Sequence, residues 1–81
     1  MPSRYGAPAA LLQAGDLVVI DLAGLPVSGR VLWAENAGLA GAPEWIAVLR
    51  LPAGGRWVWD QRRMGGEVYH QKNSRAERML A

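Results

Sequence analysis

Few residues of this chain carry side chains that could act as a nucleophile or a base. The 81-residue sequence has no cysteine and one histidine, His70, while Ser28 and Ser74 are its only serines after residue 3. Hydrolysis by a serine nucleophile needs a histidine and a carboxylate in a defined arrangement, and no acidic residue stands at a recognised spacing from these three. We therefore expect no catalytic residue, and we interpret His70 as an exposed histidine.

Metal and phosphate sites have as little support. Glu67 and His70 are three residues apart, a spacing at which a carboxylate and an imidazole share one face of a helix in carboxylate metal centres. One such pair without further ligands is a weak sign. The pairs Gly54-Gly55 and Gly65-Gly66 lack the other residues of a phosphate-binding loop. We expect no metal site and no cofactor.

Tryptophan and arginine give the clearest sign of binding. The chain has four tryptophans and no phenylalanine, and eight of its nine basic residues are arginine. Two tryptophans with nearby arginines either fill the core or a subunit interface, or they form an exposed surface that stacks on bases and binds phosphates or an acidic protein. The candidate binding residues are Arg56, Trp57, Trp59, Arg62 and Arg63.

The charge is unevenly distributed along the chain. The net charge is +2, with −2 over residues 1–49 and +4 over residues 50–81. The basic second half could face an anionic partner. A net charge of this size is low for a nucleic-acid-binding protein, and a solvated surface is the simpler interpretation.

Length and composition indicate one small domain. A chain of 81 residues buries a limited core, and association between copies is a common supplement. The longest apolar run, residues 17–20, is too short to span a bilayer, and residues 1–8 lack the apolar region of a signal peptide. We expect a cytoplasmic protein that forms a homodimer or a larger assembly and has no membrane partner.

The apolar pattern predicts five short strands and a mobile start. The strands are expected at residues 16–22, 27–34, 45–51, 56–60 and 67–70. The segments between them are expected as loops at 23–26, 35–44 and 52–55, and as a polar turn with one helical turn at 61–66. In the second strand, Gly29, Val31 and Trp33 are expected to share a face. The core is expected to contain Val18, Ile20, Val31, Ile46 and Val48, with one or two tryptophans.

Three parts of the chain are predicted. Residues 1–14 have no sustained period and are expected to be a flexible arm. Residues 15–70 hold all five strands and form the domain. Residues 71–81 are expected to be a tail or a short helix, because Ser74 and Glu77 have the spacing of a helix capping box.

The first two strands are similar to those of a known group of small barrels. Their opening resembles that of the Src-homology-3 (SH3) type, which KOW and Tudor-like domains share. The positions that match are Gly15, Asp16, Val18, Ile20, Gly29 and Val31. The resemblance covers residues 15–70 and implies an all-β fold, a five-stranded and strongly bent antiparallel barrel. It implies no activity.

Narrower families share parts of the same opening and lack a match elsewhere. PilZ domains have similar strands, but their two cyclic di-GMP motifs, Arg-x-x-x-Arg and Asp-x-Ser-x-x-Gly, are absent here. Plasmid-type dihydrofolate reductases are similar in length, but their Val-Gln-Ile-Tyr strand is absent. MazF-type toxins can begin as residues 15–22 do, but the Arg-rich segment that follows is missing and this chain is too short.

Together these observations predict a small non-catalytic interaction module that mediates protein–protein contact or self-association. The alternative is a nucleic-acid-binding barrel that uses the basic, Trp-containing second half. An enzyme whose site forms at a symmetric oligomer interface has the least support.

Overall fold

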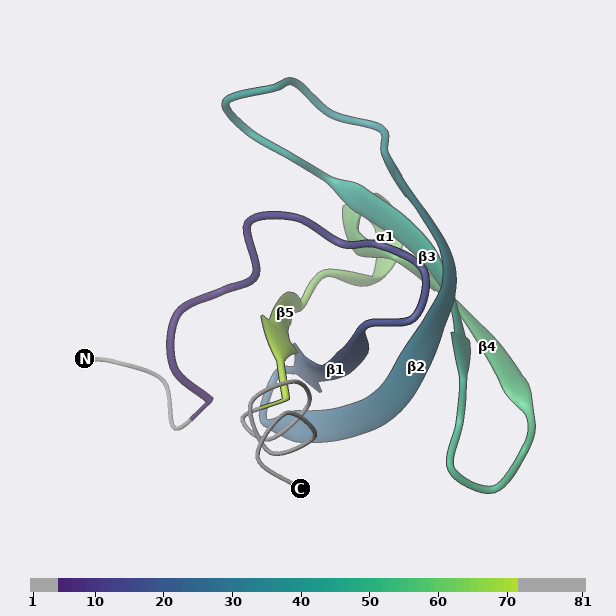
Figure 1. Cartoon of the computed structure of the whole chain (residues 1–81). Helices are drawn as coiled ribbons and strands as arrows, with labels where there is room; N and C mark the ends of the chain where they lie inside the picture. The colour runs from purple at the N-terminus through teal and green to yellow at the C-terminus, as the bar shows by residue number, and fades with distance from the viewer. Residues whose placement is uncertain (1–4, 72–81) are drawn as a thin grey trace, which may run out of the picture.

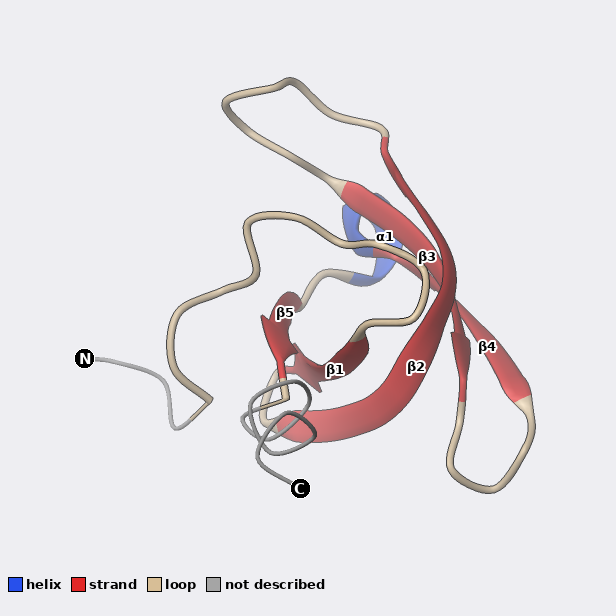
Figure 2. Ribbon diagram, in the orientation of Figure 1, coloured by secondary structure: helices blue, strands red, loops and turns tan. Residues whose placement is uncertain are grey.

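Residues 5–71 form a strongly bent antiparallel sheet in the computed structural model, which describes this part of the chain (Figure 1). The elements are β1 Leu17–Leu22, β2 Leu25–Asn36, β3 Trp45–Arg50, β4 Arg56–Asp60, α1 Gln61–Met64 and β5 Glu67–His70. The strand order is β4-β3-β2-β1-β5, and α1 is one turn between β4 and β5 (Figure 2). The predicted all-β class with five strands is confirmed. The edges β4 and β5 are not paired with each other, so the sheet is open, and its closure into a barrel stays a prediction.

The predicted strand bounds agree closely with the observed ones except in β2. Strands β4 and β5 and the helical turn after β4 lie where the sequence places them. Strand β1 begins one residue later than expected, and β3 ends one residue earlier. Strand β2 covers 12 residues, because it extends beyond the predicted 27–34 at both ends. This length allows β2 to pair with β1 through its first half and with β3 through its second half.

The turn between β1 and β2 is shorter than predicted. A loop over residues 23–26 is wrong, because Leu25 and Pro26 already pair with Leu22 and Asp21. Only Ala23 and Gly24 form the turn, with φ of 54° and 93°. Positive φ at both central residues is what a two-residue type I′ hairpin requires. The Asp21 carboxylate stabilises the turn by accepting a hydrogen bond from the Gly24 N–H at 2.7 Å.

The core lies on the inner, concave face of the sheet. Strand β3 shows the alternation that defines this face: Trp45, Ala47 and Leu49 are buried, while the residues between them are only partly buried. Ile46 and Val48 were expected in the core and instead lie on the outer face. The strand is apolar on both faces, so its period alone could not show which set points inward. The buried core residues are Leu12, Val18, Ile20, Val31, Trp45, Ala47, Leu49, Trp59 and Val68.

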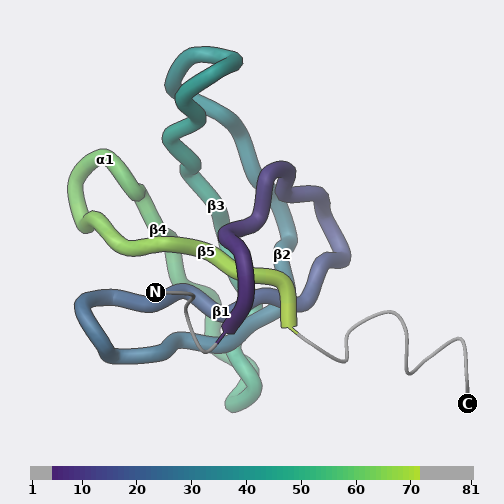
Figure 3. The backbone as a smooth tube through the Cα atoms, turned by 90° about the vertical axis from the view of Figure 1, so that its left-hand side faces the viewer, coloured from purple at the N-terminus to yellow at the C-terminus, as the bar shows by residue number. Residues whose placement is uncertain are grey.

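The segment before β1 contributes to this core. Leu12 is buried there, and the Ala9 N–H donates a hydrogen bond to the Val68 carbonyl of β5 at 2.7 Å. The rings of Tyr5 and Tyr69 lie 5.3 Å apart between centroids. The chain crosses β5 at this point (Figure 3). Part of the predicted arm therefore packs on the sheet, and the predicted C-terminal helix, which falls on residues 72–81, lies outside the described residues.

Candidate functional site

The two tryptophans of β4 that were candidates for an exposed surface point into the core. Trp59 is fully buried, and its indole Nε1 donates a hydrogen bond to the Gly65 carbonyl at 2.9 Å. Trp57 lies on the same face and packs, partly buried, against the core. The exposed aromatic surface expected from this pair is therefore not formed by Trp59. The alternative interpretation, in which these tryptophans fill the core, describes their position.

The three candidate arginines do not gather at one place. Arg56 begins β4, whereas Arg62 and Arg63 lie in α1 beyond the other end of that strand. A five-residue strand is about 13 Å long between its first and last Cα atoms, at about 3.3 Å per residue. Arg62 lies near Glu44 of the β2–β3 loop, with Nε 4.0 Å from Oε1. The three arginines that the sequence groups as one candidate binding surface are thus divided between two ends of the sheet.

The outer face of β2, β3 and β4 carries an exposed apolar row, which we define as Trp33, Val48 and Val58. The strand register makes them direct neighbours, with Trp33 opposite Val48 and Val48 opposite Val58. Trp33 is 48% exposed and Val58 is 57% exposed. Val48 lies between them and is partly buried. A row of apolar side chains on one sheet face is more informative than single exposed ones, which are common on protein surfaces.

A β-bulge turns Trp33 toward this face. Val31 lies opposite Leu49 and Trp33 lies opposite Val48, so Leu32 is the extra residue on β2. Simple alternation places Trp33 on the same face as Val31, in the core, and that prediction is wrong. The bulge shifts the phase by one residue, and Trp33 becomes the exposed tryptophan of the sheet.

An arginine row lies beside the apolar row on the outer face, and it consists of Arg30, Arg50 and Arg56. Arg50 is opposite Arg30 on one side and Arg56 on the other. Like charges directly opposite each other destabilise a sheet. Within residues 5–71, no carboxylate lies within 4.0 Å of these guanidinium groups, and the Arg30 Nη1 donates to the Gly15 carbonyl at 3.4 Å. The row therefore presents positive charge without a partner from the described chain.

An acidic row, Glu35, Ile46 and Asp60, borders the apolar row on its other side. The register places Ile46 between the two carboxylates. Asp60 Oδ1 also accepts a hydrogen bond from the Arg62 backbone N–H at 3.1 Å, which caps α1. The outer face thus changes from positive through apolar to negative along the strands.

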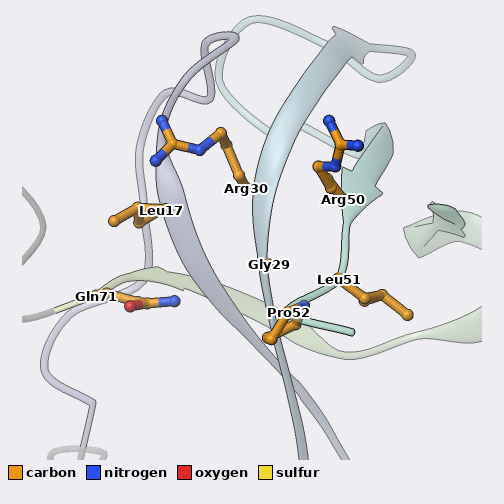
Figure 4. A pocket seen from close by; sticks show the side chains of 7 residues that line it. All are labelled: Leu17, Gly29, Arg30, Arg50, Leu51, Pro52 and Gln71. Carbon is orange, nitrogen blue, oxygen red and sulfur yellow. The ribbon is translucent and has the colours of Figure 1, made fainter. Parts of the chain in front are cut away.

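A hollow of about 300 Å³ lies at the arginine row (Figure 4). Arg30 comes from β2 and Arg50 from the neighbouring β3, and their guanidinium groups lie on opposite sides of the β2 ribbon in this view. Leu17, Pro52 and Gln71 complete most of its wall. The hollow combines two cations with apolar side chains, which suits an anionic group carried on an apolar body.

The two residues considered for metal binding are not brought together on one face in the described chain. Glu67 and His70 lie on strand β5, where side chains three residues apart point to opposite faces, so they do not share a helix face. The imidazole Nδ1 of His70 lies 4.0 Å from Asp16 Oδ2. Among residues 5–71, no group of three or more His, Asp or Glu side chains could hold a metal ion. Ser28 lies in β2 opposite Val19, and Ser74 is outside the described residues.

Sequence reasoning missed the residues that make the outer face distinctive. Arg30 and Arg50 are 20 residues apart in the sequence and become neighbours only through the register of β2 with β3, and the bulge at Leu32 turns Trp33 toward the same face. Their residue types gave no signal of this arrangement.

Among residues 5–71, the structure contains no helix with the length and apolar character needed to span a membrane. No protein-family model matches this chain, and no match was found among curated proteins or solved structures.

Proposed function

We propose that this chain is a small non-catalytic interaction module that mediates self-association or protein–protein contact through the outer face of β2, β3 and β4. The exposed apolar row is the observation that carries the proposal. Covering Trp33 and Val58 removes apolar surface from water, which contributes about 25 cal/mol for each Å² before the entropy cost of association is subtracted. Large aromatic side chains are also enriched among the residues that dominate binding energy at protein interfaces.

The fold that we propose for this module is an SH3-like barrel. Two features of the sheet support the resemblance: β5 returns to pair with β1, and one helical turn connects β4 to β5. The strong bend of the sheet supports it as well (Figure 1). A cytoplasmic location remains a prediction from the sequence.

Nucleic-acid binding is the second candidate, and the arginine row favours it. Three guanidinium groups that have no ion pair within residues 5–71 lie beside the exposed Trp33, and they could bind phosphates while one base stacks on the indole. The acidic row weakens this candidate, because Glu35 and Asp60 repel a phosphate chain that crosses the same face. Self-association or protein contact accommodates charges of both signs and is therefore the better supported function.

Light scattering over a range of concentrations, with and without a mixed-sequence single-stranded oligonucleotide, tests both candidates. We expect a mass above that of a monomer at high micromolar concentration. Trp33→Ser and Val58→Ser should each lower it, because they remove apolar contact. Leu25→Ser is the matched control, since Leu25 is 65% exposed at the start of β2 and lies outside the apolar row.

The oligonucleotide arm separates the second candidate from the first. If phosphates bind the arginine row, replacing Arg30, Arg50 and Arg56 by Gln should reduce the slope of log K against log salt by about 2 on a single strand. A monomer mass at every concentration would contradict self-association. Association that Trp33→Ser leaves unchanged would contradict the choice of the outer face.

A further inference from the structure

The three rows of the outer face follow one another in a fixed order. Along β4 the order is Arg56, Val58 and Asp60. Strand β3 runs in the opposite direction and places Arg50, Val48 and the uncharged Ile46 beside them. Consecutive rows are two residues apart along these strands, which is about 6.6 Å. The face therefore has a positive edge, an apolar centre and a negative edge.

The charged rows cannot neutralise each other within one chain. Arg56 and Asp60 are four residues apart on one strand, and about 13 Å separates their Cα atoms. Glu35 and Asp60 have no ion pair within 4.0 Å in the described residues, and neither does the arginine row. Both charged edges are thus open to a partner that carries the same order of rows in reverse.

We propose that this partner is a second copy of the chain, related to the first by a two-fold axis that runs along the apolar row. This inference rests on the proposed function and specifies its partner. A half-turn about such an axis reverses the direction of every strand and leaves each strand above its own counterpart. The apolar rows then stack on each other, and each arginine row lies over the acidic row of the other copy.

The register gives the contacts of this arrangement. Arg30 faces Glu35 of the second copy, because both belong to β2. Arg56 faces Asp60 of the second copy, because both belong to β4. Arg50 lies over Ile46 of the second copy and therefore between the two carboxylates. Each contact occurs twice, as in every interface between identical surfaces.

Charge selects this arrangement among the face-to-face alternatives. A half-turn about an axis parallel to the strands would place arginine row on arginine row, and like charges opposed at an interface are disfavoured. A nucleic acid laid across the whole face would meet the acidic row. Arg63 and Asp60 line a second hollow, separate from the one at the arginine row, so that a positive charge already lies near Asp60. The contact between Arg30 and Glu35 is consequently the clearer one to test.

A charge swap between two variants provides the test. Arg30→Glu alone places two acidic pairs at the interface, and Glu35→Arg alone places two basic pairs there. A mixed dimer of the two variants contains only pairs of opposite charge. We expect the dissociation constant to rise at least about tenfold for each variant alone, and an equimolar mixture to return to within about threefold of the wild type.

Sedimentation equilibrium, with one variant carrying a mass tag, distinguishes the mixed dimer from the two homodimers. Glu67→Arg makes the same charge change on β5, a strand outside the three that form the proposed interface, and should leave the dissociation constant unchanged. Circular dichroism shows whether each variant is folded. Should one of them not fold, Arg56→Glu with Asp60→Arg provides a second swap, because Arg56 faces Asp60 of the other copy.

Three results would overturn this inference. One is a wild type that stays monomeric. Another is a pair of variants that each associate as the wild type does. The third is a mixture of weakened variants that does not recover, which shows that Arg30 and Glu35 do not face each other. In the second and third cases, the proposed function still stands if the wild type associates and the Trp33→Ser variant associates more weakly.

Discussion

Trp59 and Trp33 lie on opposite faces of the same three strands. Trp59 is fully enclosed on the inner face, and its N–H is satisfied by the Gly65 carbonyl. Trp33 lies on the outer face and is 48% exposed. The comparison teaches that the number of tryptophans says little about their role. The indole of Trp59 packs in the core and stabilises the fold, whereas about half of Trp33 stays exposed to solvent.

The largest expected effect is on the inner face. Replacing Trp59 by Ala leaves a cavity in the core and also removes the hydrogen bond to Gly65, which should lower the free energy of unfolding by about 3–5 kcal/mol. Urea denaturation followed by circular dichroism measures this change.

Trp33→Ala is the matched control and makes the comparison quantitative. At concentrations where the chain is monomeric, its effect should stay below about 1 kcal/mol, because a surface side chain leaves no cavity. If Trp59→Ala and Trp33→Ala lowered the free energy of unfolding equally, the assignment of Trp59 to the inner face and Trp33 to the outer face would be contradicted.

The second prediction concerns Gly29 of β2, which lies close to Leu49 and Arg50 of β3. A Cβ atom on Gly29 would lie 2.9 Å from the Arg50 carbonyl oxygen and 3.2 Å from the Leu49 Cβ. Gly29→Ala therefore forces β2 away from β3 and should cost about 1–3 kcal/mol in the free energy of unfolding. Gly55→Ala is the control, because no atom lies within 4 Å of a Cβ there. If both variants unfold at the same urea concentration, β2 and β3 are not packed this closely.

The smallest expected effect has the opposite sign. Arg50→Gln relieves the repulsion from Arg30 and Arg56, and it should stabilise the monomer by about 0.2–1 kcal/mol at low salt. The gain should shrink in 1 M salt, where the screening length falls to about 3 Å. Thermal denaturation at two salt concentrations measures it. Arg62→Gln, which loses a partner in Glu44, should not stabilise, and a gain there would show a general charge effect.

The sequence predicted the strands better than their faces. Strand β4 alternates cleanly between charged or aliphatic and aromatic residues, and its bounds and inner face follow directly. Strand β3 is apolar at five consecutive positions, so that Ile46 and Val48 were assigned to the wrong face. The turn at Ala23 was missed because positive φ at an alanine has no signal in the sequence.

The candidate site was predicted less well, for a physical reason. Sequence proximity grouped Arg56 with Arg62 and Arg63, whereas hydrogen-bond register groups it with Arg50 and Arg30. Register depends on the pairing of whole strands and on where a bulge inserts an extra residue, as Leu32 does. Neither is visible in the local pattern, although the general expectation of arginines beside a tryptophan agrees with the face that forms.

The segment before β1 also determines how the sheet ends. Strand edges are templates for further strands and hence for aggregation, and proteins commonly cover them. At β5, the hydrogen bond from Ala9 to Val68 and the contact of Tyr5 with Tyr69 occupy part of that edge. Leu12 of the same segment lies in the core. If the chain were cut between residues 14 and 17 and this segment were released, the edge of β5 and the core around Leu12 would both be exposed. Proteolysis at this point therefore yields an aggregation-prone product in place of a shortened native fold.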